Sequence, residues 1–237
     1  MRTLAWIAIG GIGLGAASLS LAFTLGGPRI EDQLLDFSFG SRCTDSDSHA
    51  NANLRERHLA WQGGDEIDLA LPGTVRYRGG EGSDIVVRGA PELLDHVEVR
   101  RGRLTLNCRS SRDPRGFEVT LPGRAFRRIG IAGSGNLVME NVNQPELALS
   151  IAGSGSVSAQ GAVERATIHL AGSGQARLAD LAVKQLTVDV AGSGRVEANP
   201  TESADISISG SGDVKLVHQP ATLRSKVAGS GRITSSP

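Results

Sequence analysis

Ala132-Gly133-Ser134-Gly135 is the first of six nearly identical tetrapeptides in this chain. Successive copies are separated by 20, 19, 20, 18 and 19 residues, and the later ones begin at Ala152, Ala171, Ala191, Ser209 and Ala228. A fixed period of this length is typical of stacked repeats, in which each unit buries its apolar face against its neighbours. The tetrapeptide therefore predicts a repeat fold.

Apolar and polar residues alternate on both sides of each copy. Before the second copy, Leu147, Leu149 and Ile151 occupy every other position, and Val157 and Ala159 do so after it. A period of two predicts strands with one buried face. Each repeat is thus expected to be a strand, a sharp corner, a second strand and a variable connection, such as 141–145 or 199–203.

The corner composition fits close stacking of such repeats. Glycine supplies positive φ values and lacks the Cβ that would meet the next coil, and the serine is expected to bond neighbouring backbone groups and stack in register. A helical repeat is excluded, because it needs apolar spacings of three and four and tolerates fewer glycines. The expected structural corners are Gly133, Ser134, Gly135, Gly153, Ser154, Gly155, Gly172, Ser173, Gly174, Gly192, Ser193, Gly194, Gly210, Ser211, Gly212, Gly229, Ser230 and Gly231.

The fold class predicted is all-β, a β-solenoid with coils of about 19 residues. With 31 glycines and only 3% aromatic residues, the chain suits a core of thin aliphatic layers. Residues 129–237 form the regular repeats, and residues 56–128 are expected to be degenerate coils that cap them. In this cap, Leu71-Pro72-Gly73 and Leu121-Pro122-Gly123 are expected to occupy the corner position.

A hydrophobic helix is predicted in residues 1–25. Residues 4–25 form a stretch of 22 residues without charge, which is long enough to span a bilayer, while Ser20-Leu21-Ala22 resembles a cleavage site. The segment is a signal peptide or, as its length favours, a retained transmembrane anchor. Both alternatives place the rest of the chain outside the cytoplasm, in the cell envelope: periplasmic, anchored to the inner membrane, or secreted.

Residues 26–55 are predicted to be a stalk or linker, because residues 41–48 are polar, small and without periodicity, while residues 30–39 are expected to form a short amphipathic piece. Outside the cytoplasm, Cys43 and Cys108 are most simply a disulfide between the stalk and the cap. The alternative is a metal site that adds His49, His58 and His96 to the two cysteines, although these spacings match no standard zinc pattern.

Four other patterns bear on chemistry. Residues 79–86 match one glycine-rich calcium-binding nonapeptide, but a single copy favours a tight turn. Asp65 and Asp68 are a carboxylate pair of the kind that glycosidases use, and a run of arginines from Arg100 to Arg115 is most simply a solvated face. The repeats contain His169 and His218, with no evident relation to a nucleophilic serine. No catalytic residue, metal or cofactor is therefore predicted.

The residue that follows each corner points outward and changes from coil to coil. Stacked in register, these residues would form a candidate interaction stripe of Asn136, Ser156, Gln175, Arg195, Asp213 and Arg232. The last coil ends in an open sheet edge, which natural proteins cover, charge or pair. We therefore expect self-association through the C-terminal end of the solenoid. Equal numbers of basic and acidic residues, 25 each, argue against nucleic acid as a partner.

The repeated corner, preceded by Leu121-Pro-Gly-Arg-Ala-Phe126, resembles the bacterial GIN-domain family, which is described as adhesin heads of autotransporters. The resemblance covers about residues 56–235 and implies a right-handed β-solenoid in the cell envelope with an adhesion or interaction role. It implies no catalytic residues. Two functions remain: a non-enzymatic envelope module that binds an unknown protein or glycan, and a polysaccharide-binding or polysaccharide-cleaving solenoid. The absence of aromatic residues from the repeats favours the first.

Overall fold

The computed structural model describes residues 54–80, 82–107 and 117–236. The predicted hydrophobic helix, most of the stalk, and Cys43 and Cys108 lie outside these ranges. Within them, no helix is both long and apolar enough to cross a membrane.

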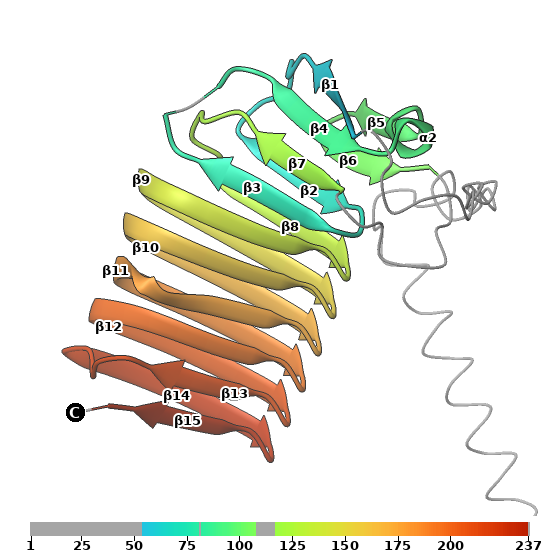
Figure 1. The fold of residues 1–237 in the computed structure, drawn as a ribbon. Helices are drawn as coiled ribbons and strands as arrows, with labels where there is room; N and C mark the ends of the chain where they lie inside the picture. The colour runs from blue at the N-terminus through green and yellow to red at the C-terminus, as the bar shows by residue number, and fades with distance from the viewer. Residues whose placement is uncertain (1–53, 81, 108–116, 237) are drawn as a thin grey trace, which may run out of the picture. The chain divides into compact units, whose positions relative to one another are not determined.

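The described residues form a β-solenoid with one short helix, α2 (Pro91–Leu94) (Figure 1). The predicted all-β repeat fold is therefore confirmed. Its strands are β1 (Arg55–Leu59), β2 (Glu66–Ala70), β3 (Thr74–Arg78), β4 (Ile85–Gly89), β5 (Val97–Arg100), β6 (Arg103–Leu106), β7 (Glu118–Leu121), β8 (Arg128–Gly133), β9 (Asn136–Gly153), β10 (Ser156–Gly172), β11 (Gln175–Gly192), β12 (Arg195–Gly210), β13 (Asp213–Leu216), β14 (Thr222–Gly229) and β15 (Arg232–Ser235).

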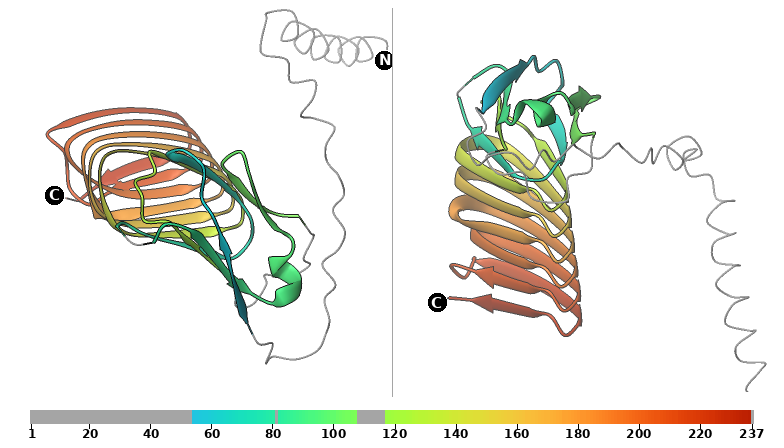
Figure 2. Two further views of the ribbon diagram at one scale, coloured as in Figure 1. Left: turned by 90° about the horizontal axis from the view of Figure 1, so that it is seen from above. Right: turned by 45° about the vertical axis from the view of Figure 1, so that its right-hand side comes forward.

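The regular coils pair in parallel, each with the coil before and after it. Strand β10 pairs with β9 on one edge and with β11 on the other, and the corners remain in register, so that Gly153, Gly172 and Gly192 stack. Viewed from above, successive coils lie over one another (Figure 2). Equivalent positions of the repeat therefore form rows along the molecule.

The variable connections, whose conformation the sequence did not predict, are themselves paired strand. Strands β9 to β12 each run from one corner to the next. The register shifts between Ala159 and Gly161 and between Leu178 and Ala182. Such bulges absorb the one or two residues by which the coils differ in length.

Each corner requires its two glycines for different reasons. Gly192 has a φ of +125°, and a Cβ there would lie 2.4 Å from the carbonyl oxygen of Gly172 in the preceding coil. A Cβ on Gly194 would lie 2.1 Å from Leu170 Cδ2 in the core. Between them, the Ser193 N–H donates a hydrogen bond of 2.9 Å to the Gly172 carbonyl. This corner is therefore a backbone ladder without room for side chains at either glycine, whereas a Cβ on Gly133 in the first corner would meet nothing within 4 Å.

The core is thin and is filled by alternating volumes. In the four coils whose corners begin at Ala152, Ala171, Ala191 and Ser209, one inward residue lies five positions before the first corner residue and another lies seven positions after it. In these coils the two positions combine one large and one small side chain, all buried: Leu147 with Ala159, Ala166 with Leu178, Leu186 with Ala198, and Ala204 with Leu216. Such pairing suits a narrow, close-packed interior.

The cap is only partly solenoidal. Strands β2 and β3 form a coil that pairs in parallel with β8 and β9, and Gly73 lies at its corner, where its carbonyl accepts a hydrogen bond from the Asn136 N–H. By contrast, β4 pairs antiparallel with β1 and β7, and β5 pairs antiparallel with β6. Strands β6 and β7 also pair in parallel with β2 and β3, so the predicted degenerate coils account for these four strands, whereas β1, β4 and β5 are antiparallel additions.

The second Leu-Pro-Gly corner was wrongly predicted. Strand β7 pairs in parallel with β3 and places Leu121 beside Tyr77, after the second strand of the coil rather than at its corner. The Gly123 N–H instead donates to Gly82 in the turn between β3 and β4. Phe126, which lies shortly after Gly123, is fully buried and packs edge-on against Trp61 and Tyr77.

Candidate functional site

The predicted interaction stripe forms one continuous row on the outer face of the second strands. Neighbouring members are register partners throughout, and Thr74 and Glu118 of the cap extend the row at its upper end. We call this row, Asn136, Ser156, Gln175, Arg195, Asp213 and Arg232, the polar stripe.

Within the polar stripe, adjacent side chains complement one another. The Ser156 hydroxyl donates to Asn136 Oδ1 at 2.7 Å, and a guanidinium nitrogen of Arg195 lies 3.8 Å from an Asp213 carboxylate oxygen. Two residues further along the same strands, a parallel outward row contains Arg177, which donates to Gln175 Oε1 at 2.5 Å. The stripe thus presents both donors and acceptors, and its two arginines and one aspartate give a formal charge of +1.

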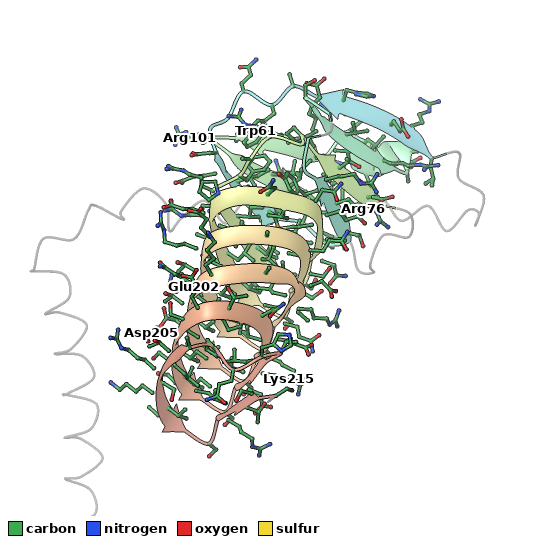
Figure 3. The ribbon with its side chains drawn as sticks, turned by 90° about the vertical axis from the view of Figure 1, so that its left-hand side faces the viewer. Trp61, Arg76, Arg101, Glu202, Asp205 and Lys215 are labelled. Carbon is green, nitrogen blue, oxygen red and sulfur yellow. The ribbon has the colours of Figure 1, made fainter. Side chains whose placement is uncertain are left out.

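The parallel row also carries matched charges. Within it, the Lys215 ammonium lies 2.8 Å from the Glu197 carboxylate, and Arg76 of this row pairs with Glu118, which extends the adjacent polar stripe in the cap. Figure 3 shows Arg76 and Lys215 on one side of the ribbon and Asp205 on the other. All four side chains of these two pairs are between 32% and 57% exposed, so water screens the charges and each pair contributes little to stability.

A second row, on the face of the first strands, was missed by the sequence analysis. Ser150, His169, Asp189 and Ser207 are successive register partners, and His169 Nδ1 lies 3.1 Å from Asp189 Oδ2. All four residues precede the first corner residue of their coil by two positions, so the repeat itself contained the signal. Ser150 and His169 are thus neighbours in one row, a spatial relation that the sequence alone did not reveal.

The order Ser150, His169, Asp189 matches that of a catalytic triad, but the geometry does not support acyl transfer. No hydrogen bond joins Ser150 to His169 among the described residues, and both His169 and Asp189 are about half exposed. An oxyanion hole requires unpaired backbone N–H groups beside the nucleophile. Here the neighbouring backbone is committed to the parallel ladder on both sides.

The corner serines were expected to bond neighbouring backbone groups through their hydroxyls. In the described residues, the backbone N–H rather than the hydroxyl makes the link, as in Ser154 to Gly133 at 2.9 Å. The hydroxyls are exposed and form a row along one edge of the prism. The identity of serine here is not explained by a bond within the described part of the chain.

The carboxylates considered for glycosidase chemistry are paired with arginines. Asp65 pairs with Arg127, and Asp68 lies 3.3 Å from Arg103. A shallow depression of about 310 Å³ nearby is lined by Glu146 and Arg165 among others, and these two charged groups lie 2.5 Å apart. The hydrogen bond and charge of Arg165 hold the pKa of Glu146 below its usual value, so Glu146 is not a candidate general acid near neutrality.

Neither a metal site nor a sugar platform is found within the described residues. No group of three potential metal ligands converges there. The glycine-rich segment 79–86, predicted to be a tight turn, contains the connection from β3 to β4, where the Gly80 N–H donates a hydrogen bond to the Gly123 carbonyl. The aromatic side chains of these ranges, Trp61, Tyr77, Phe117 and Phe126, are all buried in the cap. Cys43 and Cys108, which would form the predicted disulfide or contribute to the alternative metal site, lie outside the described residues.

The in-register coils and their polar outer rows define a stacked β-solenoid repeat protein. The chain belongs to the family described as "Putative auto-transporter adhesin, head GIN domain", whose model matches residues 65–220. None of the curated proteins is significantly similar to it.

Solved structures share the fold. A protein of Bacteroides fragilis described as "a putative adhesin" is 20% identical, with a TM-score of 0.61, and the match covers 78% of this chain and 98% of that one. A "putative adhesin" from Parabacteroides distasonis is 17% identical, with a TM-score of 0.51 and the same coverages. At these identities the likeness shows a common fold alone.

Proposed function

We propose that this protein is a non-enzymatic interaction module of the cell envelope that adheres to a protein or glycan through the polar stripe. The observation that carries the proposal is the row itself: six outward side chains of different chemistry stand at equivalent positions of successive coils. The family description supports an adhesion-like role and an envelope or extracellular location.

The rigidity of the row favours recognition. Strands β9 to β12 pair on both edges, so the backbone beneath the stripe is fixed before a partner arrives. Side chains on such a support lose less conformational freedom on binding than side chains on a mobile loop. Side chains spaced by roughly 4.8 Å along the molecule suit an elongated partner that contacts several coils at once.

The charged side chains support a binding role over an enzymatic one. Glu146, Asp65 and Asp68 each face an arginine, and His169 faces Asp189, all on exposed sheet surfaces. General acid–base catalysis instead needs a group whose pKa is shifted toward the working pH and which lies within reach of the substrate. In the part of the chain that the structure describes, the aromatic side chains are buried and offer no stacking surface of the kind that a polysaccharide-cleaving site would use.

Site-specific photo-crosslinking in cells tests the stripe. A photoreactive amino acid at Gln175 of the full chain is expected to give discrete adducts, which mass spectrometry identifies, and the same group at Lys184, outside the stripe, is the matched control. The double variant R195A/D213A should lower the yield at Gln175 and leave the circular dichroism spectrum unchanged. Equal adducts from both positions, or none from Gln175, would contradict the proposal.

Two further measurements test the location and the absence of catalysis. Intact mass of protein from fractionated cells, with and without external protease, should show protection until the outer membrane is opened, or loss on protease treatment if the protein is at the surface. Recovery in the cytoplasmic fraction would refute an envelope role. Hydrolysis of an envelope polysaccharide that the D68N variant abolishes would overturn the non-enzymatic assignment.

A further inference from the structure

The last coil, formed by β14 and β15, has an open sheet edge. Strand β14 pairs with β12 and β15 pairs with β13, and no other described strand pairs with either of them. All eight residues of β14 are exposed. Figure 1 shows this coil at the end of the solenoid away from the cap. Such an edge presents unpaired N–H and C=O groups to any strand that approaches.

This edge is bordered by apolar side chains in core positions. Leu223 and Val227 are register partners of Ala204 and Ile208, which are 2% and 1% exposed. Leu223 and Val227 themselves are 38% and 42% exposed. A further strand at this edge would bury both side chains, as each internal coil buries those of its neighbour.

The outward side chains of the last coil carry positive charge. Arg224 and Lys226 alternate with Leu223 and Val227 on β14, and the last acidic residue of the sequence is Asp213. Elsewhere in the solenoid, a base in one coil faces an acid in the adjacent coil, as in Arg165 with Glu146 and Lys215 with Glu197. The register partner of Arg224 in the adjacent coil is Asp205 and that of Lys226 is Ser207, but within the described residues no ion pair involves Arg224 or Lys226.

We propose that the edge of β14 binds an extended acidic segment of a partner protein, which adds a strand to the solenoid. Alternate apolar side chains of this segment cover Leu223 and Val227, and the intervening Asp or Glu side chains pair with Arg224 and Lys226. Backbone hydrogen bonds supply affinity, and the alternating side chains supply specificity. This surface lies at the end of the solenoid and does not depend on binding by the polar stripe.

The charges favour this partner over a second copy of the chain. A twofold end-to-end pairing of β14 strands, centred on Ser225, would set Arg224 of each copy opposite Lys226 of the other. Like charges directly opposite one another destabilise a strand pair, and lysine on an edge strand is a known device against self-pairing. The expected self-association thus competes with an unfavourable charge arrangement.

The test uses the full chain and a fluorescent peptide of about eight alternating Val and Glu residues, a typical strand length. Fluorescence anisotropy should show saturable binding that weakens with salt. A peptide with Lys in place of Glu should not bind, and a peptide with a central proline should bind at least about tenfold more weakly, because proline removes a ladder donor.

The R224E/K226E variant should reverse the preference and bind the Val-Lys peptide, with a change of about tenfold or more for the Val-Glu peptide. The R177E/K184E variant makes the same change of charge away from the edge and should bind like the natural chain. No binding of the Val-Glu peptide, or equal binding by R224E/K226E, would overturn the proposal. So would a concentration-dependent dimer, seen by light scattering, that blocks peptide binding, because the occupant would then be a second copy.

Discussion

Replacing Gly192 with alanine should destabilise the solenoid severely. Its φ of +125° is a conformation that L side chains rarely adopt, which costs about 1–3 kcal/mol. The new Cβ would also lie 2.4 Å from the carbonyl oxygen of Gly172, a backbone atom that cannot rotate away. Relieving this overlap adds about 1–3 kcal/mol, so we expect a loss of about 2–6 kcal/mol.

Ser193 supplies the matched control, because it is exposed and contributes only its backbone N–H to the corner. The S193A variant should change stability by less than about 0.5 kcal/mol. Urea unfolding followed by far-ultraviolet circular dichroism measures both, and hydrogen exchange shows whether the loss is confined to neighbouring coils, as solenoids permit. A G192A variant within about 0.5 kcal/mol of the natural chain, or an equal loss in S193A, would refute this account of the corner.

Three further predictions follow from burial and charge. I206A should lower the unfolding free energy by about 2–5 kcal/mol in urea unfolding, because Ile206 is fully buried. L223A at the open end should lower it far less. Similar losses in the two variants would contradict the core described here. In R165Q, the pKa of Glu146 should rise toward its usual value in an NMR titration, and an unchanged pKa would count against the pair. Because the folded-state pKa is lowered, the stability that the pair contributes is present above the usual Glu pKa and is lost as pH falls. The unfolding free energy of R165Q should therefore depend less on pH in the acid range. Burial raises the pKa of Tyr77, the one tyrosine in the chain, so its phenolate absorbance should appear at higher pH in the folded protein than in the urea-unfolded protein. The stability that the buried neutral phenol contributes should be lost as pH rises above the usual phenol pKa. Coincident titrations of the folded and unfolded protein would exclude this burial.

The regular half of the fold was predictable because its signals are local and repeated. The spacing of the tetrapeptides fixed the coil length, and the alternation around Leu149 and Ile151 identified inward residues that are 1% and 2% exposed. Six repetitions also make the register certain, since a slip of one residue would expose every inward side chain. For the same reason the geometry of the polar stripe could be derived from Gln175 and its equivalents.

The cap could not be derived in the same way, because pairing partners there are distant and strand direction leaves no local trace. Leu71-Pro-Gly73 and Leu121-Pro-Gly123 have the same sequence, yet only the first lies at a corner. What distinguishes them is the pairing of β7 with β3 and β4, which long-range packing around Phe126 decides. Alternation indicates a strand but does not say whether its neighbour is parallel or antiparallel.

Inward and outward positions of each coil are under different structural restrictions, which explains why the fold is easier to infer than the function. Inward positions are buried, and a Cβ added at a corner glycine such as Gly194 would lie less than 3 Å from neighbouring atoms. Outward positions such as Gln175 and Arg195 face solvent, and different residue types occupy the same row from coil to coil. A substitution such as Q175R should therefore leave stability within about 0.5 kcal/mol of the natural chain and yet change what the polar stripe binds. If Q175R instead unfolds the protein, the stripe is part of the structural framework and the recognition surface must be sought elsewhere, first at the open edge of β14.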